Sequence, residues 1–466
     1  MLSFGFFIVM MLAALRRLLN LDVNCDLRSC TSSNNNCGES KGNSTFIPDQ
    51  YIPQSTLSTW KFDYYGPDQA IQDYNPDNHP IFTTTQTINV RLFTEVFGGQ
   101  TSPMNECKHI LYDGLSKSDV IKLQGVTYTL ANKCKKDNWN ESWKNDDLWV
   151  LDSHHILESC DIIFDWMQQT LTARNNKEWK ILAVDYGDAH DKVYECEKLA
   201  KAAEGWYFVA KRSIEVGREW DEGLQFPRRG SLAKSTSKSI MHSPYPARTD
   251  VAQEIANVVK KRGLSSPIDV NLLRDVDVSH FYARQTNVGT KAYFDNLRNG
   301  INSILRFMDG MVLGNNRKLT TFCGLAGKDK KLGRNVVSPE YINTMLRSKI
   351  IVVAQRDAWS DHYRLMEALS SGAMVLADET LILPRGLRHG ESLIMFHSYS
   401  DLRAKLLYYL QHDEERLLVA KRGWDVAMGY HRSWHAMESL IFGHPITNAG
   451  DSMASFHKDV MSNNHV

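Results

Sequence analysis

The chain has 466 residues, which is enough for two or three domains with full-sized cores. Its 54 Lys and Arg residues balance its 54 Asp and Glu residues, so no overall positive charge favours binding to nucleic acid or to a membrane surface. Apolar residues make up 42% and aromatic residues 10% of the sequence, which excludes a disordered protein and indicates a folded, enzyme-sized one.

The N-terminus is apolar. Residues 4–15 form an apolar run interrupted only by Gly5, and Arg16 and Arg17 follow it. This length suits the core of a signal peptide and is short for a membrane span, which needs about 20 residues. We predict that residues 1–21 are a signal peptide or a signal anchor, and that the protein lies in the endoplasmic reticulum or Golgi lumen, either free or membrane-anchored. An amphipathic start or an incorrect start codon is the alternative.

Two further features agree with a lumenal protein. Asn43 and Asn140 each begin an Asn-x-Ser/Thr triplet, the acceptor for N-glycosylation. The eight cysteines show no CxxC and no metal-ligand spacing, and Cys107 with Cys134 is the first disulfide to consider. Residues 22–85 are rich in Ser, Asn, Asp, Pro and Gly without periodicity, and we predict a polar stem there.

The first folded half, residues 86–262, alternates apolar runs with helical periodicity. Helices are predicted at 157–173 and 250–261, and the alternation of apolar runs with helices predicts a Rossmann-like lobe. No GxGxxG follows a strand, so a nicotinamide or flavin site has no support. The runs interpreted as strands are residues 88–93, 109–112, 148–151, 180–184 and 206–210.

Within this half, the loop after the run at 180–184 carries candidate catalytic residues. It turns at Gly187 into Asp188 and His190, beyond the carboxyl end of a strand. A carboxylate beside a histidine can orient the imidazole and stabilise its protonated form, so either residue could act as the general base. The alternative is a turn in which the Asp side chains cap backbone N–H groups.

A Gly-Ser-Pro segment at 263–267 predicts the hinge between two lobes, so the second lobe would span residues 263–445. Its predicted strands are residues 268–273, 319–324, 350–354 and 373–377. Its predicted helices are residues 293–308, 338–347, 361–371 and 430–442. Residues 446–466 are predicted to be a flexible tail.

The unit at 349–378 is a strand, a helix and a second strand with very short joints. The strands should therefore be parallel, and the polar face of the helix should emerge near their carboxyl ends, where open α/β sheets bind ligands. That face carries Tyr363, Arg364, Glu367 and Ser371, and Gly372 ends the helix. The alternative is that Arg364 and Glu367 form a solvated pair of opposite charges.

The run RLMEALSSGAMVLAD, with the sequence that follows it, resembles the donor-binding half of GT-B glycosyltransferases. It is most similar to the spore-protein-like and exostosin-like branches, including ribitol xylosyltransferases, and the resemblance covers residues 267–442. It implies an α/β protein of two Rossmann-like lobes with a cleft between them. In that family a glutamate at this position binds the nucleotide ribose and nearby basic residues meet the diphosphate. By resemblance, Glu367 is the ribose ligand and Arg364 a phosphate or structural partner.

Further donor-binding candidates lie around this unit. Arg356 follows the strand at 350–354, Tyr363, Ser371 and Gly372 belong to the helix and its end, and Arg388 and His389 lie in a later loop that should face the donor. One residue departs from the family pattern, since Trp359 stands where retaining members often carry a second glutamate. The stereochemical outcome is therefore open.

The function expected from the resemblance is transfer of a hexosyl or pentosyl group from a nucleotide-diphosphate sugar to a hydroxyl of a glycan or glycoprotein. GT-B enzymes generally act without a bound divalent ion, and no Asp-x-Asp pair stands in a plausible setting, so we expect no cofactor and no metal site. The balanced charge of the chain predicts no nucleic-acid partner. The alternative is a catalytically inactive module that binds a glycan or a nucleotide sugar.

Overall fold

A computed structural model describes most of the chain beyond residue 79. The described residues are 80–83, 86–95, 107–129, 139–153, 156–176, 179–186, 193–212, 214–215, 240–282, 292–314, 316–324, 337–354, 359–360, 363–378 and 383–461. The predicted signal segment and nearly all of the predicted stem therefore lie outside them. In the part of the chain that is described, no helix is long and apolar enough to cross a membrane. All of the described residues belong to one compact unit, so both lobes are part of it.

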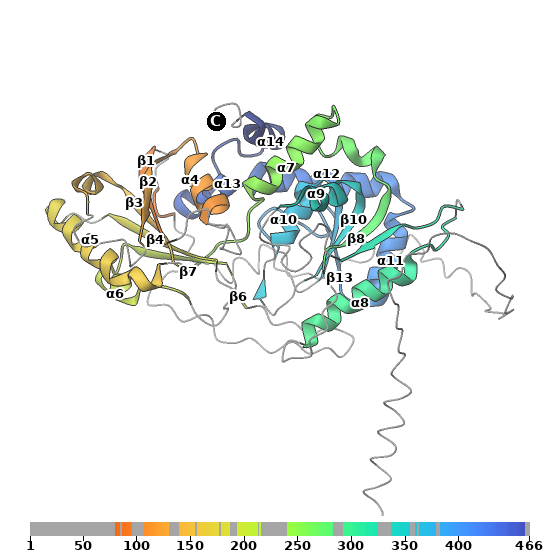
Figure 1. Cartoon of the computed structure of the whole chain (residues 1–466), viewed down its shortest axis with the longest axis horizontal. Coiled ribbons are helices and arrows are strands. Elements are labelled where there is room, and N and C mark those ends of the chain that lie inside the picture. The colour runs from red at the N-terminus through yellow and green to blue at the C-terminus, as the bar shows by residue number, and fades with distance from the viewer. Residues whose placement is uncertain are drawn as a thin grey trace, which may run out of the picture. The chain divides into compact units, whose positions relative to one another are not determined.

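The first lobe is a six-stranded sheet in which every neighbouring pair is parallel (Figure 1), in the order β2-β1-β3-β4-β5-β7. The inner strands β1, β3, β4 and β5 are buried on both faces, which explains their largely apolar sequences, whereas the edge strand β2 is mostly half-buried or exposed. The strands are β1 Ile88–Thr94, β2 Ile121–Tyr128, β3 Leu148–Asp152, β4 Lys180–Asp185, β5 Tyr207–Lys211 and β7 Ile240–His242, and the helices include α4 Asp113–Ser116, α5 Cys160–Ala173 and α6 Glu197–Ala202.

The structure confirms four of the five predicted strands of this lobe and corrects the fifth. Residues 109–112 belong to a π-helix, Cys107–Tyr112, that leads into α4. Its buried residues Cys107, Ile110 and Leu111 have helical spacing and join the core of the lobe. A disulfide joins Cys160 to Cys196. The pairing considered from the sequence involves Cys134, which lies outside the described residues.

The second lobe is a five-stranded sheet, also parallel throughout, in the order β13-β12-β10-β8-β9. One core cluster lies between this sheet and α7, α9, α10 and α12, and another lies on the side of α8 and α11 (Figure 1). The strands are β8 Val276–His280, β9 Thr321–Cys323, β10 Ser348–Val353, β12 Met374–Asp378 and β13 Ile394–Phe396, and the helices are α7 Thr249–Lys261, α8 Ala292–Met308, α9 Pro339–Arg347, α10 Tyr363–Ser370, α11 Tyr399–Tyr409 and α12 Asp413–Tyr430.

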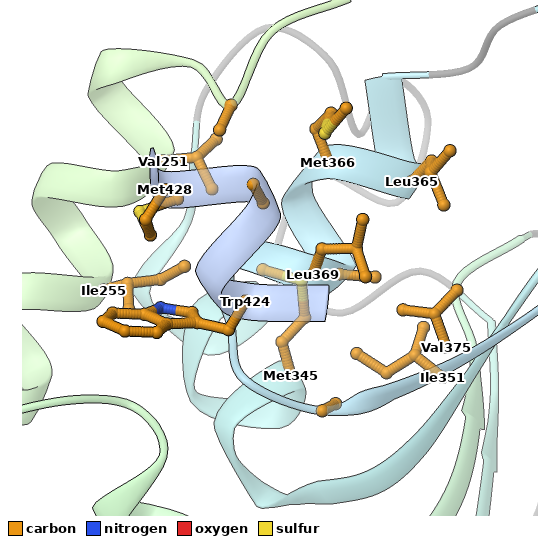
Figure 2. Close-up of a cluster of buried hydrophobic side chains, with 14 of the residues drawn as sticks. Val251, Ile255, Met345, Ile351, Leu365, Met366, Leu369, Val375, Trp424 and Met428 are labelled. Atoms are coloured by element: carbon orange, nitrogen blue, oxygen red, sulfur yellow. The ribbon is translucent and has the colours of Figure 1, made fainter. Parts of the chain in front are cut away.

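Helix α7 belongs to the second lobe, which moves the boundary between the lobes. Val251 and Ile255 of α7 pack in one cluster with Met345 of α9 and Leu365 of α10 (Figure 2). The predicted boundary at 262/263 is therefore too late. The Gly-Ser-Pro segment separates α7 from a 3-10 helix, Asp269–Leu273, inside the lobe. That 3-10 helix replaces the strand predicted at 268–273, and β8 is the strand that follows it.

The chain crosses between the lobes near Ala247 and again near Arg432, and these two crossings lie side by side. Ala247 forms a parallel bridge with Arg432, and its N–H donates to the carbonyl of His431 at 2.6 Å. After this point α13, Ser433–Phe442, packs on α4 and on the π-helix of the first lobe, so the helix predicted at 430–442 returns to that lobe. A short antiparallel pair, β6 Ile214–Glu215 with β11 Trp359–Ser360, also links the lobes.

The predicted flexible tail is in part a packed helix. Residues Ser452–Met461 form α14, which lies against α12 and α7. Its Phe456 is 2% exposed and belongs to the core of the second lobe. With this correction, the expected α/β architecture of two Rossmann-like lobes is confirmed.

Candidate functional site

The strand order of the second lobe identifies a ligand-binding position at the carboxyl ends of its strands. The chain passes from β8 to β9 on one side and then to β10, β12 and β13 on the other, so the connections diverge between β8 and β10. Ligands of open α/β sheets bind outside the carboxyl ends of the strands at such a point. Here His280 ends β8, Ala354 follows β10, and α10 begins at Tyr363.

Two arginines lie over one tyrosine ring at these strand ends. The guanidinium carbon of Arg298 is 3.9 Å and that of Arg364 is 4.2 Å from the ring centroid of Tyr282. The Tyr282 hydroxyl donates to the carbonyl of Ala354 at 2.8 Å, and Arg298 donates to the same carbonyl at 3.3 Å. Tyr282 is 3% and Arg298 4% exposed. The cluster therefore concentrates two positive charges in a water-poor position, where an anion would be bound strongly.

The histidine that ends β8 fixes this cluster to α8. His280 is fully buried, and its Nδ1 lies 2.8 Å from Oδ1 of Asn302. Burial lowers the pKa of His280 to about 3, with the nearby Arg298 and Arg364 acting in the same direction, so the imidazole is neutral at physiological pH. Asn302 also donates to the carbonyl of Tyr282 at 3.4 Å. Nδ1–H is therefore the donor to Oδ1, and Arg298 and Asn302 of α8 both hold the end of β8.

Glu367 lies about one helical turn after Arg364 and is 5% exposed. The hydroxyl of Tyr341, on α9, donates to Oε2 of Glu367 at 2.6 Å. Burial raises the pKa of Glu367, and the positive charge of Arg248, the bond from Tyr341 and the charge of Arg364 oppose that shift. The solvated Arg364–Glu367 pair considered from the sequence is therefore wrong, because α7 packs against α10 and Tyr341 of α9 bonds to the buried Glu367 carboxylate.

Tyr363 connects these strand ends to the first lobe. It is 5% exposed, and its ring centroid lies 6.0 Å from that of Tyr245, which follows β7. The guanidinium of Arg212, which follows β5, lies 4.8 Å from the Tyr245 ring. Next to it, Lys211 donates to Asp185 at 2.8 Å in a buried ion pair at the ends of β5 and β4. The carboxyl ends of the two sheets thus meet through the Tyr245–Tyr363 contact, and cationic side chains of the first lobe lie beside it.

Ser371 and Gly372 lie at the other end of α10. The Ser371 hydroxyl donates to the carbonyl of Ala368 at 2.7 Å, and the Ser371 carbonyl accepts from Arg274 at 2.7 Å. Gly372 has φ +70°, and a Cβ there would lie 3.1 Å from the carbonyl carbon and oxygen of Pro267. These contacts give both residues a structural role at the joint between α10 and β12, and their surroundings lend the predicted donor-binding role no support.

The two candidates in the later loop also have structural contacts. Arg388 lies 4.0 Å from Glu391, and both side chains are largely exposed. His389 accepts at Nδ1 from the N–H of Met395 at 3.0 Å, and burial lowers its pKa to about 4. His389 therefore acts here as a neutral acceptor that holds the start of β13. Three other predicted site residues, Arg356, Asp188 and His190, lie outside the described residues.

Sequence reasoning missed His280, Tyr282 and Arg298. The segment VDVSHFYAR carries a signal, since alternating apolar residues precede a histidine, two aromatic residues and a cation. The strand was predicted at 268–273 instead of at β8, so the residues that follow the carboxyl end of β8 were not considered. Within the described ranges, no three His, Cys, Asp or Glu side chains gather as a metal site would require.

Residues 303–441 match a family model described as Glycosyl transferase-like, and this range contains Arg364 and Glu367. No curated protein matches the chain. Solved structures that it resembles include the Anabaena protein HepE in complex with UDP-glucose, at 9% identity over 81% of this chain and 100% of that one, with a TM-score of 0.34. Another is a sucrose-phosphate synthase from Thermosynechococcus elongatus, at 11% identity, 81% and 100% coverage and a TM-score of 0.40.

The matched part of the second lobe is therefore glycosyltransferase-like in sequence. The narrower resemblance to exostosin-like proteins and ribitol xylosyltransferases stays a prediction.

Proposed function

We propose that this protein transfers a hexosyl or pentosyl group from a nucleotide-diphosphate sugar to a hydroxyl of a glycan or glycoprotein. The observation that carries the proposal is the pair of guanidinium groups of Arg298 and Arg364 over Tyr282, at the strand ends where the connections diverge. The family match to residues 303–441 supports the same class of reaction.

The arginine pair suits the charge changes of this reaction. As the bond between the anomeric carbon and the diphosphate oxygen breaks, negative charge grows on the diphosphate, and pre-positioned cations stabilise it most in a site that excludes water. Arg364, the less buried of the two, would meet the diphosphate directly, and Arg298 would add to the positive potential. Glu367 would accept hydrogen bonds from the nucleotide ribose. Asp188 or His190 would take the proton of the acceptor hydroxyl, and no metal ion would be required.

We further propose that the protein works in the lumen of the secretory pathway. The disulfide between Cys160 and Cys196 supports this location, because disulfides form and persist in oxidising compartments and are rare in the cytosol. The predicted signal peptide or anchor at 1–21 is consistent with it.

Calorimetric titration tests the function, with UDP-glucose as the first nucleotide sugar, UDP alone as its truncated form, and product analysis after incubation with hydroxyl acceptors. Arg364→Gln removes a charge-assisted partner worth about 1.5 to 3 kcal/mol, so donor affinity should fall roughly 10- to 150-fold. Arg347→Gln is the matched control, since Arg347 forms an exposed ion pair with Asp275 at 2.6 Å and should leave affinity unchanged.

Three outcomes separate the possibilities. Donor binding that depends on Arg364, followed by product, supports the transferase. Binding without product from any acceptor supports the inactive binding module instead. A folded Arg364→Gln protein that binds every donor as well as the unchanged protein does would refute the assignment of the arginine pair.

A further inference from the structure

The acceptor triplet Asn140-Glu141-Ser142 is presented on the surface in a fixed conformation. All three residues are exposed. Asn140 precedes a 3-10 helix, Glu141–Asn145, and its Oδ1 accepts from the N–H of Ser142 at 2.8 Å. In this turn Oδ1 is held by the backbone, and Ser142 lies beside Asn140.

Two tryptophans anchor the triplet from either side. Trp139 donates from Nε1 to Oγ1 of Thr170, on α5, at 2.9 Å. Trp143 is 5% exposed, and its ring centroid lies 5.6 Å from that of Phe93 and 5.2 Å from that of Trp166. The residues between these anchors are therefore held outward by the core of the first lobe.

The triplet lies at the amino ends of the strands of the first sheet, and the candidate site faces their carboxyl ends. The 3-10 helix that it begins leads into the amino end of β3, Leu148–Asp152. Tyr245, which meets Tyr363 of the second lobe, and Arg212, which lies over the Tyr245 ring, follow the carboxyl ends of β7 and β5. A large group attached at Asn140 would therefore leave the edge that faces the second lobe uncovered.

We propose that Asn140 is an N-glycosylation site of this protein. The Asn140 side-chain nitrogen would bond to the anomeric carbon of an oligosaccharide carried on a lipid diphosphate. That nitrogen loses one proton, and the lipid diphosphate leaves with the electron pair of the broken C–O bond. The inference rests on the proposed secretory location and not on the proposed glycosyl transfer.

Two independent observations carry the proposal beyond the triplet itself. A triplet of this kind arises by chance in many cytosolic proteins, and there it is never modified. Here the same lobe holds the disulfide Cys160–Cys196, which indicates the oxidising compartment in which N-glycosylation takes place. The triplet is also exposed and held in a turn, whereas a buried one would have no room for a glycan.

The test is secretory expression of the full chain in eukaryotic cells, followed by peptide mass spectrometry with and without an N-glycan-removing amidase. The peptide that contains Asn140 should carry a glycan, and the amidase should convert Asn140 to Asp. Asn140→Asp keeps the oxygen that caps the 3-10 helix and should lose the glycan, as should Ser142→Ala. Ser142→Thr retains the triplet and should keep the glycan, which makes it the matched control.

Site-specific peptides also separate Asn140 from Asn43, whose triplet could be modified independently. An unmodified Asn140 in protein whose Cys160–Cys196 disulfide has formed would overturn the proposal. A full chain that stays in the cytosol with both cysteines reduced would also overturn it, because the inference rests on the secretory location. Neither result depends on transferase activity, so failure of the glycosylation proposal and failure of the proposed function are distinguishable.

Discussion

Replacing Glu367 by glutamine is the sharpest test of the site. The carboxylate accepts from Tyr341 at Oε2, and a carboxylate has lone pairs for further donors, such as two ribose hydroxyls. Glutamine keeps the shape and an acceptor oxygen for Tyr341 but removes the charge. Each ribose bond should therefore weaken by about 1 to 1.5 kcal/mol, the difference between a charge-assisted and a neutral hydrogen bond. Two such bonds correspond to roughly a 30- to 150-fold loss of donor affinity.

Glu367→Gln should have little effect on folding. Burial raises the pKa of Glu367, so the folded protein binds this proton more readily than the unfolded chain does. The carboxyl group therefore costs stability as pH rises through the window between its ordinary pKa and the raised one, and a neutral amide removes that cost. We expect the free energy of unfolding at neutral pH to be unchanged or slightly higher.

The measurements are calorimetric titration of UDP-glucose and urea unfolding on the same protein preparations. Tyr341→Phe is the matched control, because it removes a hydrogen bond to Glu367 while leaving the carboxylate in place. It should cost about 1 to 3 kcal/mol of stability and affect donor affinity less. Affinity of the unchanged protein should fall as pH drops through the raised pKa of Glu367, and the glutamine variant should lack this dependence. Unchanged affinity in folded Glu367→Gln would refute the ribose-ligand assignment.

Two further predictions concern structural residues. Gly372→Ala combines a positive φ with close approach to Pro267, so it should destabilise the protein by roughly 2 to 5 kcal/mol. Gly390→Ala is the control, since Gly390 has φ +81° with open space around it, and it should cost about 1 to 2 kcal/mol. Equal losses of unfolding free energy in urea would show that the approach to Pro267 does not matter. Because burial lowers the pKa of His389 from 6.5 to about 4, the unfolded chain binds this proton first, and stability is lost as pH falls across that window. His389→Asn keeps an acceptor for the N–H of Met395 and should reduce the loss in unfolding free energy between pH 7 and pH 5, and an identical pH dependence would refute this assignment.

The sequence by itself determined those helices and strands that depend only on residues close together in the chain. The unit β10-α10-β12 was found because short apolar runs, one helical period and Gly372 lie within thirty residues of chain. The two-lobe α/β architecture followed from the alternation of such elements along the chain. The polar face of α10 was also placed at the carboxyl ends of the strands, where Arg364 lies.

The tertiary structure alone decided which helices cover which sheet. Periodicity detected α7 but could not tell that Val251 and Ile255 pack on α9 and α10, so the lobe boundary was placed after α7. The same packing buries Glu367, because whether a polar helix face meets water depends on helices far away in sequence. The cluster at the candidate site joins Tyr282, Arg298 and Arg364 from three separate segments. No local pattern can reveal such a grouping, since it arises only when the parallel strands bring their carboxyl ends to one edge.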